Sequence, residues 1–277
     1  MSAVRLRDGR DLAYAEYGAP HGLPVLFLPG AGCGRLMRFG DSALTARGIR
    51  LISVDRPGLG ASTADPDKTL DSVADDVAAL LDDLAGTPVP VVANSQGAPF
   101  GLALAATGRV ERLVLASPID EVAHPPITAQ LPTPLRELVA RVAADPAGAA
   151  ALFSGFTAEG LFARIMADCP PVDRALYDDP AFRRLLRGAL DDGFRWGAAG
   201  YARDTVLAMS RWPAGLFEAA QVPVTVLFGA HDRVHSPDLG RTLAGRLPTA
   251  HLEIVSEAGG SLLWSHSGRV LDAAVGT

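Results

Sequence analysis

Ser95 is the residue whose surroundings most clearly point to chemistry. It lies in the segment VVANSQGAPFGLALAA, where an apolar run at residues 91–93 ends abruptly just before the serine. A glycine follows two residues later and begins a stretch of small, helix-prone residues. A strand, a tight turn and a helix in this order are typical of a nucleophile elbow, which exposes the serine oxygen above a sheet edge. The N-terminus of the following helix favours negative charge that develops there.

Composition limits the class of protein that can carry this serine. The chain has 277 residues, of which 48% are hydrophobic and 20% charged, enough for one large α/β domain with an inserted subdomain. Its net charge of −6 argues against a nucleic-acid partner, which usually requires a basic face. Cys33 and Cys169 are isolated, so we expect neither a disulfide framework nor a zinc site.

The sequence contains no signal for a membrane or a secretory route. The opening MSAVRLRDGRD has no apolar core of a signal peptide. No stretch reaches the roughly 18 continuous apolar residues that a membrane span needs. We therefore expect a cytoplasmic protein that acts on a small molecule and has no membrane partner.

Short apolar runs alternate with segments of helical periodicity. We predict strands at residues 3–7, 12–18, 25–28, 51–54, 89–93, 110–116, 224–228 and 252–255, with helices at 69–84 and 99–106. The stretch 120–215 contains no convincing strand, and we predict helices there at 134–144, 146–153, 157–167, 180–191 and 196–210. This order predicts a largely parallel sheet covered on both faces, formed by 1–119 and 216–277, with 120–215 as an inserted helical lid.

Five motifs resemble those of the α/β-hydrolase superfamily, in the family's order and over almost the whole chain. PVLFLPGAGCG (24–34) resembles the third strand and oxyanion loop, with Pro29 at the usual histidine. ISVDRPGLGAS (52–62) resembles the segment after the fourth strand, and ANSQGAPFGLALAA (93–106) resembles the elbow. VTVLFGAHDRV (224–234) resembles the loop that carries the acid, and HLEIVSEAGGSLLW (251–264) the histidine loop.

This resemblance implies an α/β-hydrolase fold with a mostly parallel central sheet, flanking helices and an inserted lid. It implies that Ser95 is the nucleophile and Asp232 the acid, with Asp120 as the alternative acid position. It also implies that the main-chain N–H groups of Ala31 and Gln96 form the oxyanion hole. No cofactor and no metal ion are implied.

The histidine loop departs from the family pattern. The family normally reads Ala-Gly-His there, whereas this chain reads Ala258-Gly259-Gly260, so glycine stands where the general base is expected. A serine hydroxyl is a weak nucleophile without a base to take its proton. Loss of the base typically costs on the order of 10³–10⁴ in rate.

Three explanations are open. In the first, Gly260 is an engineered substitution in a competent hydrolase. In the second, another histidine serves as the base: His266, six residues further on, is the first candidate, and His231 and His235, which flank Asp232, are the others. In the third, the natural protein uses no triad and is a non-hydrolytic catalyst, such as a cyclase, lyase or isomerase, or a ligand-binding pseudoenzyme.

The function implied by the resemblance is action on a carbonyl-containing, mainly apolar small molecule. The default reaction is hydrolysis of an ester, lactone or amide through an acyl-serine at Ser95. The non-hydrolytic alternative would use Ser95, Asn94 or Gln96 to polarise a carbonyl group. Most aromatic residues of the lid are expected to be packing contacts, while a minority line an apolar pocket over the serine.

Overall fold

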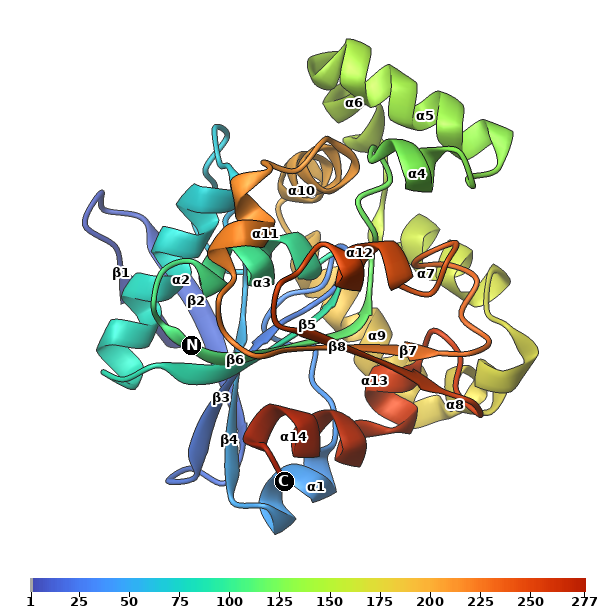
Figure 1. Cartoon of the computed structure of the whole chain (residues 1–277). Helices are drawn as coiled ribbons and strands as arrows, with labels where there is room; N and C mark the ends of the chain where they lie inside the picture. Colours follow the sequence, from blue (N-terminus) through green and yellow to red (C-terminus); the bar gives the residue numbers. More distant parts are fainter. Residues whose placement is uncertain (1) are drawn as a thin grey trace.

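The computed structural model of the chain describes residues 2–277 and contains one eight-stranded sheet (Figure 1). The strands are ordered β1-β2-β4-β3-β5-β6-β7-β8. β2 pairs antiparallel with β1 and β4, and the pairs from β4–β3 to β7–β8 are all parallel. The predicted mostly parallel sheet is thus confirmed. The strands are β1 (Ser2–Arg5), β2 (Asp11–Gly18), β3 (Leu23–Leu28), β4 (Ile49–Val54), β5 (Val89–Ser95), β6 (Val110–Pro118), β7 (Val224–Gly229) and β8 (Ala250–Val255).

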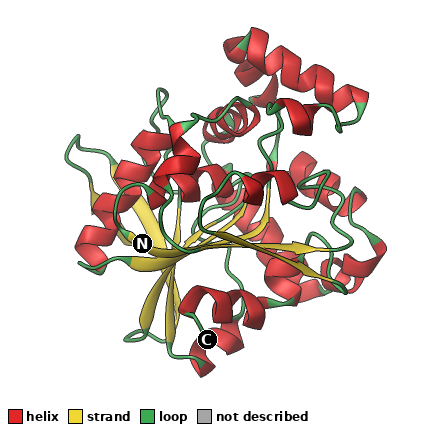
Figure 2. Ribbon diagram, viewed as in Figure 1, coloured by secondary structure: helices red, strands yellow, loops and turns green. Residues whose placement is uncertain are grey.

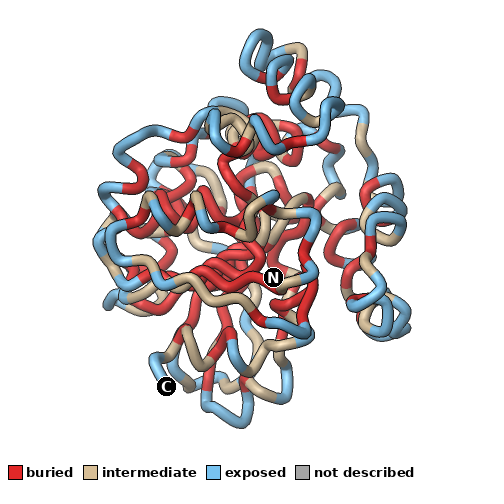
Figure 3. The backbone as a smooth tube through the Cα atoms, turned by 45° about the vertical axis from the view of Figure 1, so that its right-hand side comes forward, coloured by how far each residue is buried: buried red, intermediate tan, exposed pale blue. Residues whose placement is uncertain are grey.

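Side chains alternate between two apolar clusters along the central strands. On β3, Leu26 and Leu28 pack into one cluster, whereas Val25 and Phe27 pack into the other. Successive side chains of a strand point to opposite faces, so a strand that is apolar on both faces requires cover on both sides. The sheet accordingly lies between two helical layers (Figure 2), and the strands in its centre are buried (Figure 3).

One helical layer contains α2, α3, α11 and α12, and the other contains α1, α13 and α14 (Figure 1). Their bounds are α1 (Asp41–Ala46), α2 (Leu70–Leu84), α3 (Ala98–Ala105), α11 (Gly215–Ala219), α12 (Arg241–Gly245), α13 (Leu262–Ser265) and α14 (Ser267–Val275). A capping box defines the start of α2, because Thr69 Oγ1 accepts from the N–H of Ser72 at 3.0 Å and Ser72 Oγ accepts from the N–H of Thr69 at 2.9 Å.

The segment 120–215, which we call the inserted segment, is helical between β6 and β7. It contains α4 (Pro125–Thr128), α5 (Thr133–Ala144), α6 (Pro146–Phe153), α7 (Ala158–Ala167), the 3₁₀ turn η1 (Pro171–Asp173), α8 (Arg174–Asp178), α9 (Pro180–Gly193) and α10 (Ala199–Met209). The five helices predicted in this segment all form, within three residues of their expected limits. The elements that the sequence analysis missed, α4, η1 and α8, have five residues or fewer and are too short to show a helical period.

Within residues 2–277, no helix combines the length and the apolar character that crossing a bilayer requires.

Candidate active site

Ser95 lies at the carboxyl end of β5 in a conformation that few non-glycine residues adopt. Its φ is +49°, in the left-handed region, as a tight strand-to-helix turn requires. The turn leaves no room for a side chain at Gly97, where a Cβ would lie 2.3 Å from the carbonyl oxygen of Leu28. A close approach of α3 to β5 likewise requires Gly101, where a Cβ would lie 2.8 Å from that of Ala93. The sequence therefore holds the serine in a strained turn at the end of the strand.

The oxyanion loop lies beside this serine. A Cβ at Gly30 would lie 3.2 Å from Ser95 Cβ and 3.6 Å from Ser95 Oγ, which measures how closely the loop approaches this serine. Among residues 2–277, neither the main-chain N–H of Ala31 nor that of Gln96 donates a hydrogen bond to another group of the protein. Two free donors beside a serine are what an acyl oxyanion needs.

Asp232 follows β7 and holds a histidine. Its Oδ2 lies 2.8 Å from His235 Nδ1, while its Oδ1 accepts from the N–H groups of Val234 at 2.9 Å and His235 at 3.2 Å. Burial alone raises the pKa of Asp232, but the imidazole and these hydrogen bonds outweigh burial and hold the pKa below its usual value. The carboxylate is therefore ionised at neutral pH and orients the ring.

The environment of His235 raises its basicity. Burial lowers the pKa of the ring, but the charge of Asp232, their hydrogen bond and the nearby charge of Asp173 outweigh burial and raise the pKa above its usual value. Because Nδ1 faces Asp232, the other ring nitrogen, Nε2, is left to interact elsewhere. His235 and Ser95 line the same pocket.

The two glycines of the loop after β8 each face a side chain that arrives from another element. A Cβ at Gly260 would lie 3.3 Å from His235 Cε1 and 3.4 Å from Asp232 Oδ1. A Cβ at Gly259 would lie 2.4 Å from Asp173 Oδ2, a carboxylate of η1 in the inserted segment. That carboxylate accepts from the N–H of Ser261 at 3.1 Å and from its Oγ at 2.6 Å. His235 therefore lies next to the position at which the sequence pattern predicts a catalytic histidine.

The other predicted candidates lie elsewhere. His266 follows α13, its Nδ1 lies 2.9 Å from Ser265 Oγ and its Nε2 lies 3.5 Å from Glu257 Oε1, and it is not among the residues lining the pocket. His231 is exposed. Asp120 is buried and accepts from Ser236 Oγ at 2.8 Å, so it supports the loop after β7 and does not touch an imidazole. Burial raises the pKa of Asp120 to about 6.

The pocket above Ser95 encloses about 240 Å³ and is mainly apolar. Its walls come from the oxyanion loop, the elbow, the loops after β7 and β8, and the inserted segment. The larger apolar side chains that line it include Met37, Leu161, Ile165, Phe182, Leu186 and Trp264. Cys33 also lines it, but burial raises the pKa of this thiol to about 12, which leaves it neutral and unreactive.

The sequence analysis named His235 only as a second-rank candidate base and gave no sign of Asp173. It gave His235 little weight against His266, although the three-residue spacing from Asp232 was a usable signal: a histidine there can reach the carboxylate within one turn. Asp173 carried no signal, because only the folded chain brings η1 against the loop after β8.

Known proteins resemble this chain over the same region. A family model described as alpha/beta hydrolase fold matches residues 24–267. An uncharacterized hydrolase of Bacillus subtilis (strain 168), YcgS, is 33% identical over 116 residues, which are 41% of this chain and only 40% of that protein. A hydrolase from Pseudomonas aeruginosa PA01 superposes with a TM-score of 0.73 at 23% identity, covering 100% of this chain and 98% of the other. The esterase EaEST from Exiguobacterium antarcticum superposes with a TM-score of 0.72 at 17% identity, covering 99% and 98%.

Proposed function

The chain belongs to the α/β-hydrolase family, and from this premise we propose that it is a serine hydrolase that uses His235 as its general base. The substrate is an ester, lactone or amide of a small, mainly apolar molecule. The observation that carries the proposal is the position of His235, which is bonded to Asp232, lines the pocket with Ser95 and faces the space that Gly260 leaves open.

The reaction follows from the placement of these groups. Asp232 accepts the hydrogen on Nδ1 of His235, so Nε2 carries the free lone pair and takes the proton of Ser95 Oγ as that oxygen attacks the carbonyl carbon. The N–H groups of Ala31 and Gln96 stabilise the oxyanion. The imidazolium then gives its proton to the leaving oxygen or nitrogen, and the acyl-serine forms. Water, deprotonated by the same imidazole, hydrolyses the acyl-serine and restores the serine hydroxyl.

The pocket supports an acyl group of modest size. A dry cavity of about 150 Å³ lined by aliphatic side chains holds a benzene-sized molecule. The 240 Å³ here therefore suits an acyl or aryl group somewhat larger than benzene. The apolar walls favour aliphatic or aromatic acyl chains over charged ones.

The test combines covalent labelling with hydrolysis. A fluorophosphonate probe should label the wild-type protein and not Ser95→Ala, because only an activated serine reacts. With p-nitrophenyl acetate, butyrate and octanoate as substrates, His235→Gln should lower kcat/KM by about 10³-fold, the scale of a lost general base. His251→Gln is the matched control, since that histidine is exposed on β8.

The rival base can be tested in the same assay. His266→Gln should leave the rate within a factor of two or three of wild type. If His266→Gln abolished turnover and His235→Gln did not, the assignment of the base would be wrong. A wild-type protein that neither labels nor turns over any ester would overturn hydrolysis itself and favour non-hydrolytic chemistry or binding.

A further inference from the structure

Three charged side chains form a fully buried cluster behind the oxyanion loop. Arg56, Lys68 and Asp204 each have 0% of their side chain exposed. Asp204 Oδ2 lies 2.8 Å from Arg56 Nε, and Asp204 Oδ1 lies 2.5 Å from Lys68 Nζ. Arg56 and Lys68 thus share one carboxylate, and burial lowers the pKa of Lys68. Such burial is costly unless further hydrogen bonds compensate it, so the partners of the remaining donors indicate what the cluster does.

The remaining donors of Arg56 bind the oxyanion loop itself. Nη1 donates to the carbonyl oxygen of Pro29 at 2.6 Å, and Nη2 donates to that of Gly30 at 3.2 Å. The peptide bonds here are trans, and the C=O and N–H of a trans peptide point in opposite directions. Because the guanidinium holds the C=O of Gly30, the N–H of Ala31 must point away from it. Arg56 therefore fixes the direction of one oxyanion donor.

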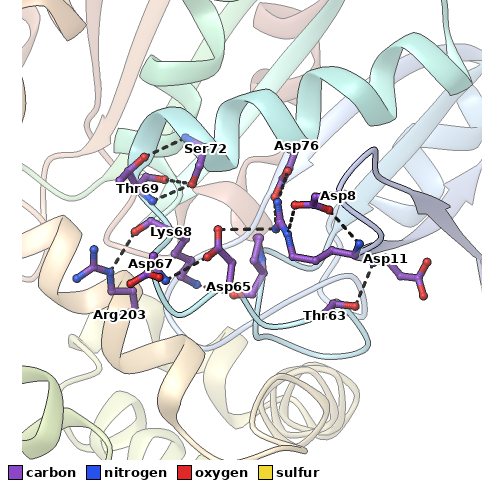
Figure 4. Close-up of polar contacts among 12 residues, drawn as sticks. Asp8, Asp11, Thr63, Asp65, Asp67, Lys68, Thr69, Ser72, Asp76 and Arg203 are labelled. Atoms are coloured by element: carbon purple, nitrogen blue, oxygen red, sulfur yellow. Dashed lines mark hydrogen bonds and ion pairs between the residues drawn. The ribbon is translucent and has the colours of Figure 1, made fainter.

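The anion that orients Arg56 comes from α10 of the inserted segment. This helix approaches the core closely, because a Cβ at Gly200 would lie 2.2 Å from the carbonyl oxygen of Gly58. Lys68 is held at the same contact, where its Nζ donates to the carbonyl oxygens of Pro57 at 2.6 Å and Gly200 at 3.2 Å. Figure 4 shows the segment that carries Lys68, with Arg203 of α10 donating to its carbonyl oxygen.

Thr205, which follows Asp204 in α10, binds the side chain of Gln96, the residue that carries the second proposed oxyanion N–H. Thr205 Oγ1 accepts from Gln96 Nε2 at 3.1 Å and donates to the carbonyl oxygen of Tyr201 at 2.8 Å. Gln96 directly follows the nucleophile and carries the other proposed oxyanion N–H. Two consecutive residues of one helix, Asp204 and Thr205, are thus connected to both halves of the oxyanion hole.

We propose that α10 is the positioning element of the oxyanion hole, acting through Asp204 and Arg56 on Ala31 and through Thr205 on Gln96. This inference rests on the proposed serine hydrolysis. None of Arg56, Asp204 and Thr205 lines the pocket, so each is a positioning residue.

The experiment compares Asp204→Asn, Arg56→Lys and Thr205→Val with a matched control. Asp192→Asn is that control, because Asp192 is also a carboxylate of the inserted segment paired with a core arginine, Arg35, at 2.7 Å. The Arg35 side chain bonds to neither the Pro29 nor the Gly30 carbonyl. Thermal melting and circular dichroism of each protein establish that it is folded.

The expected signature is a loss of kcat on p-nitrophenyl butyrate with little change in KM. Asp204→Asn and Arg56→Lys should each lower kcat by about 10²-fold, the scale of one misplaced oxyanion donor, and Thr205→Val by less. Inhibition by a boronic acid, whose tetrahedral adduct with Ser95 occupies the hole, should weaken in parallel. The pH at half-maximal kcat/KM should stay at the wild-type value, because the base is unchanged.

Two results would overturn the inference. One is a wild-type kcat in folded Asp204→Asn or Arg56→Lys; the other is an equal loss in Asp192→Asn, which would mean that any contact to the inserted segment has this effect. If Asp204→Asn did not fold, Arg56→Lys and Thr205→Val would decide the question by the same two criteria. Failure of the proposed function is distinguishable, since the wild-type protein itself would then show neither labelling nor turnover.

Discussion

Placing a histidine at position 260 in a variant that lacks His235 tests the proposed site most directly. His235→Ala should lower kcat/KM by about 10³–10⁴-fold, which corresponds to about 4–5.5 kcal/mol in the activation free energy. Adding Gly260→His to that variant should recover at least about tenfold, because the new imidazole enters the space vacated by the old one beside Asp232. The geometry sets this expectation: a Cβ at position 260 lies 3.4 Å from Asp232 Oδ1.

The Gly260→His substitution should have the opposite effect on kcat/KM in the wild-type background. There the new Cβ would lie 3.3 Å from His235 Cε1 and 3.4 Å from its Nδ1, before the rest of the ring is added. Overpacking of this kind typically costs about 1–3 kcal/mol, here at the expense of the His235–Asp232 geometry. Gly260→His alone should therefore lower kcat/KM.

The assay is kcat/KM on p-nitrophenyl butyrate for wild type, both single variants and the double variant, each shown to be folded. Gly260→Ala is the steric control, since it adds a Cβ without an imidazole. The reasoning would be refuted if Gly260→His alone raised kcat/KM by orders of magnitude, because the site would then lack a base in its present form. A double variant less active than the product of the single effects would also contradict it.

Three further predictions concern pH and packing. The kcat/KM of the wild type should rise with pH to a plateau, with a midpoint above 6.5, because His235 acts as a base only when neutral and its pKa is raised. The Asp173→Asn variant should lower that midpoint, because the charge of Asp173 helps to raise the pKa of His235. An unchanged midpoint would show that Asp173 exerts no charge effect on the ring. Gly259→Ala should destabilise the fold by about 1–3 kcal/mol in urea denaturation, since its Cβ would lie 2.4 Å from Asp173 Oδ2, and an unchanged urea midpoint would contradict the contact. Burial raises the pKa of Asp120 from 3.8 to about 6. Between pH 3.8 and about 6, the unfolded chain therefore binds fewer protons at this group than the native chain does. As pH rises through this range, the contribution of Asp120 to the free energy of unfolding falls by about 3 kcal/mol. Asp120→Asn should remove that fall, which urea titrations of both proteins at pH 4 to 7 would measure, and parallel pH dependences would refute it.

The fold was predictable because its signals are local. The strands of the central sheet are apolar on both faces and are followed by turn-forming or polar residues. The apolar runs at 25–28, 51–54 and 89–93 can therefore be recognised as strands from the sequence. Three helices of the inserted segment have N-terminal caps that a sequence displays: Asp145 before α6, Thr157 before α7 and Asp179 before α9. The short helices have neither a full period nor a strong cap.

The site was only partly predictable, because its decisive contacts join segments far apart in the sequence. Ser95 and Asp232 follow from their strand ends. The Arg56–Asp204 pair joins residues 148 positions apart, and neither residue is unusual in its own segment. His235 lies close to Asp232 in sequence, but its role depends on what it faces, which is a glycine on another loop.

A base on the loop after β7 differs physically from one on the loop after β8. Asp232 and His235 belong to one turn, in which the carboxylate also accepts both N–H groups that shape the turn. Asp120 anchors the same loop through Ser236 Oγ, and its N–H donates to the carbonyl oxygen of His235. In the proposed mechanism, acid and base are therefore preorganised by a single segment rather than by two loops that must meet. Preorganised hydrogen bonds lower a barrier without reorganisation. The loop after β8 then has only to leave space for the imidazole, and glycine at position 260 meets that requirement.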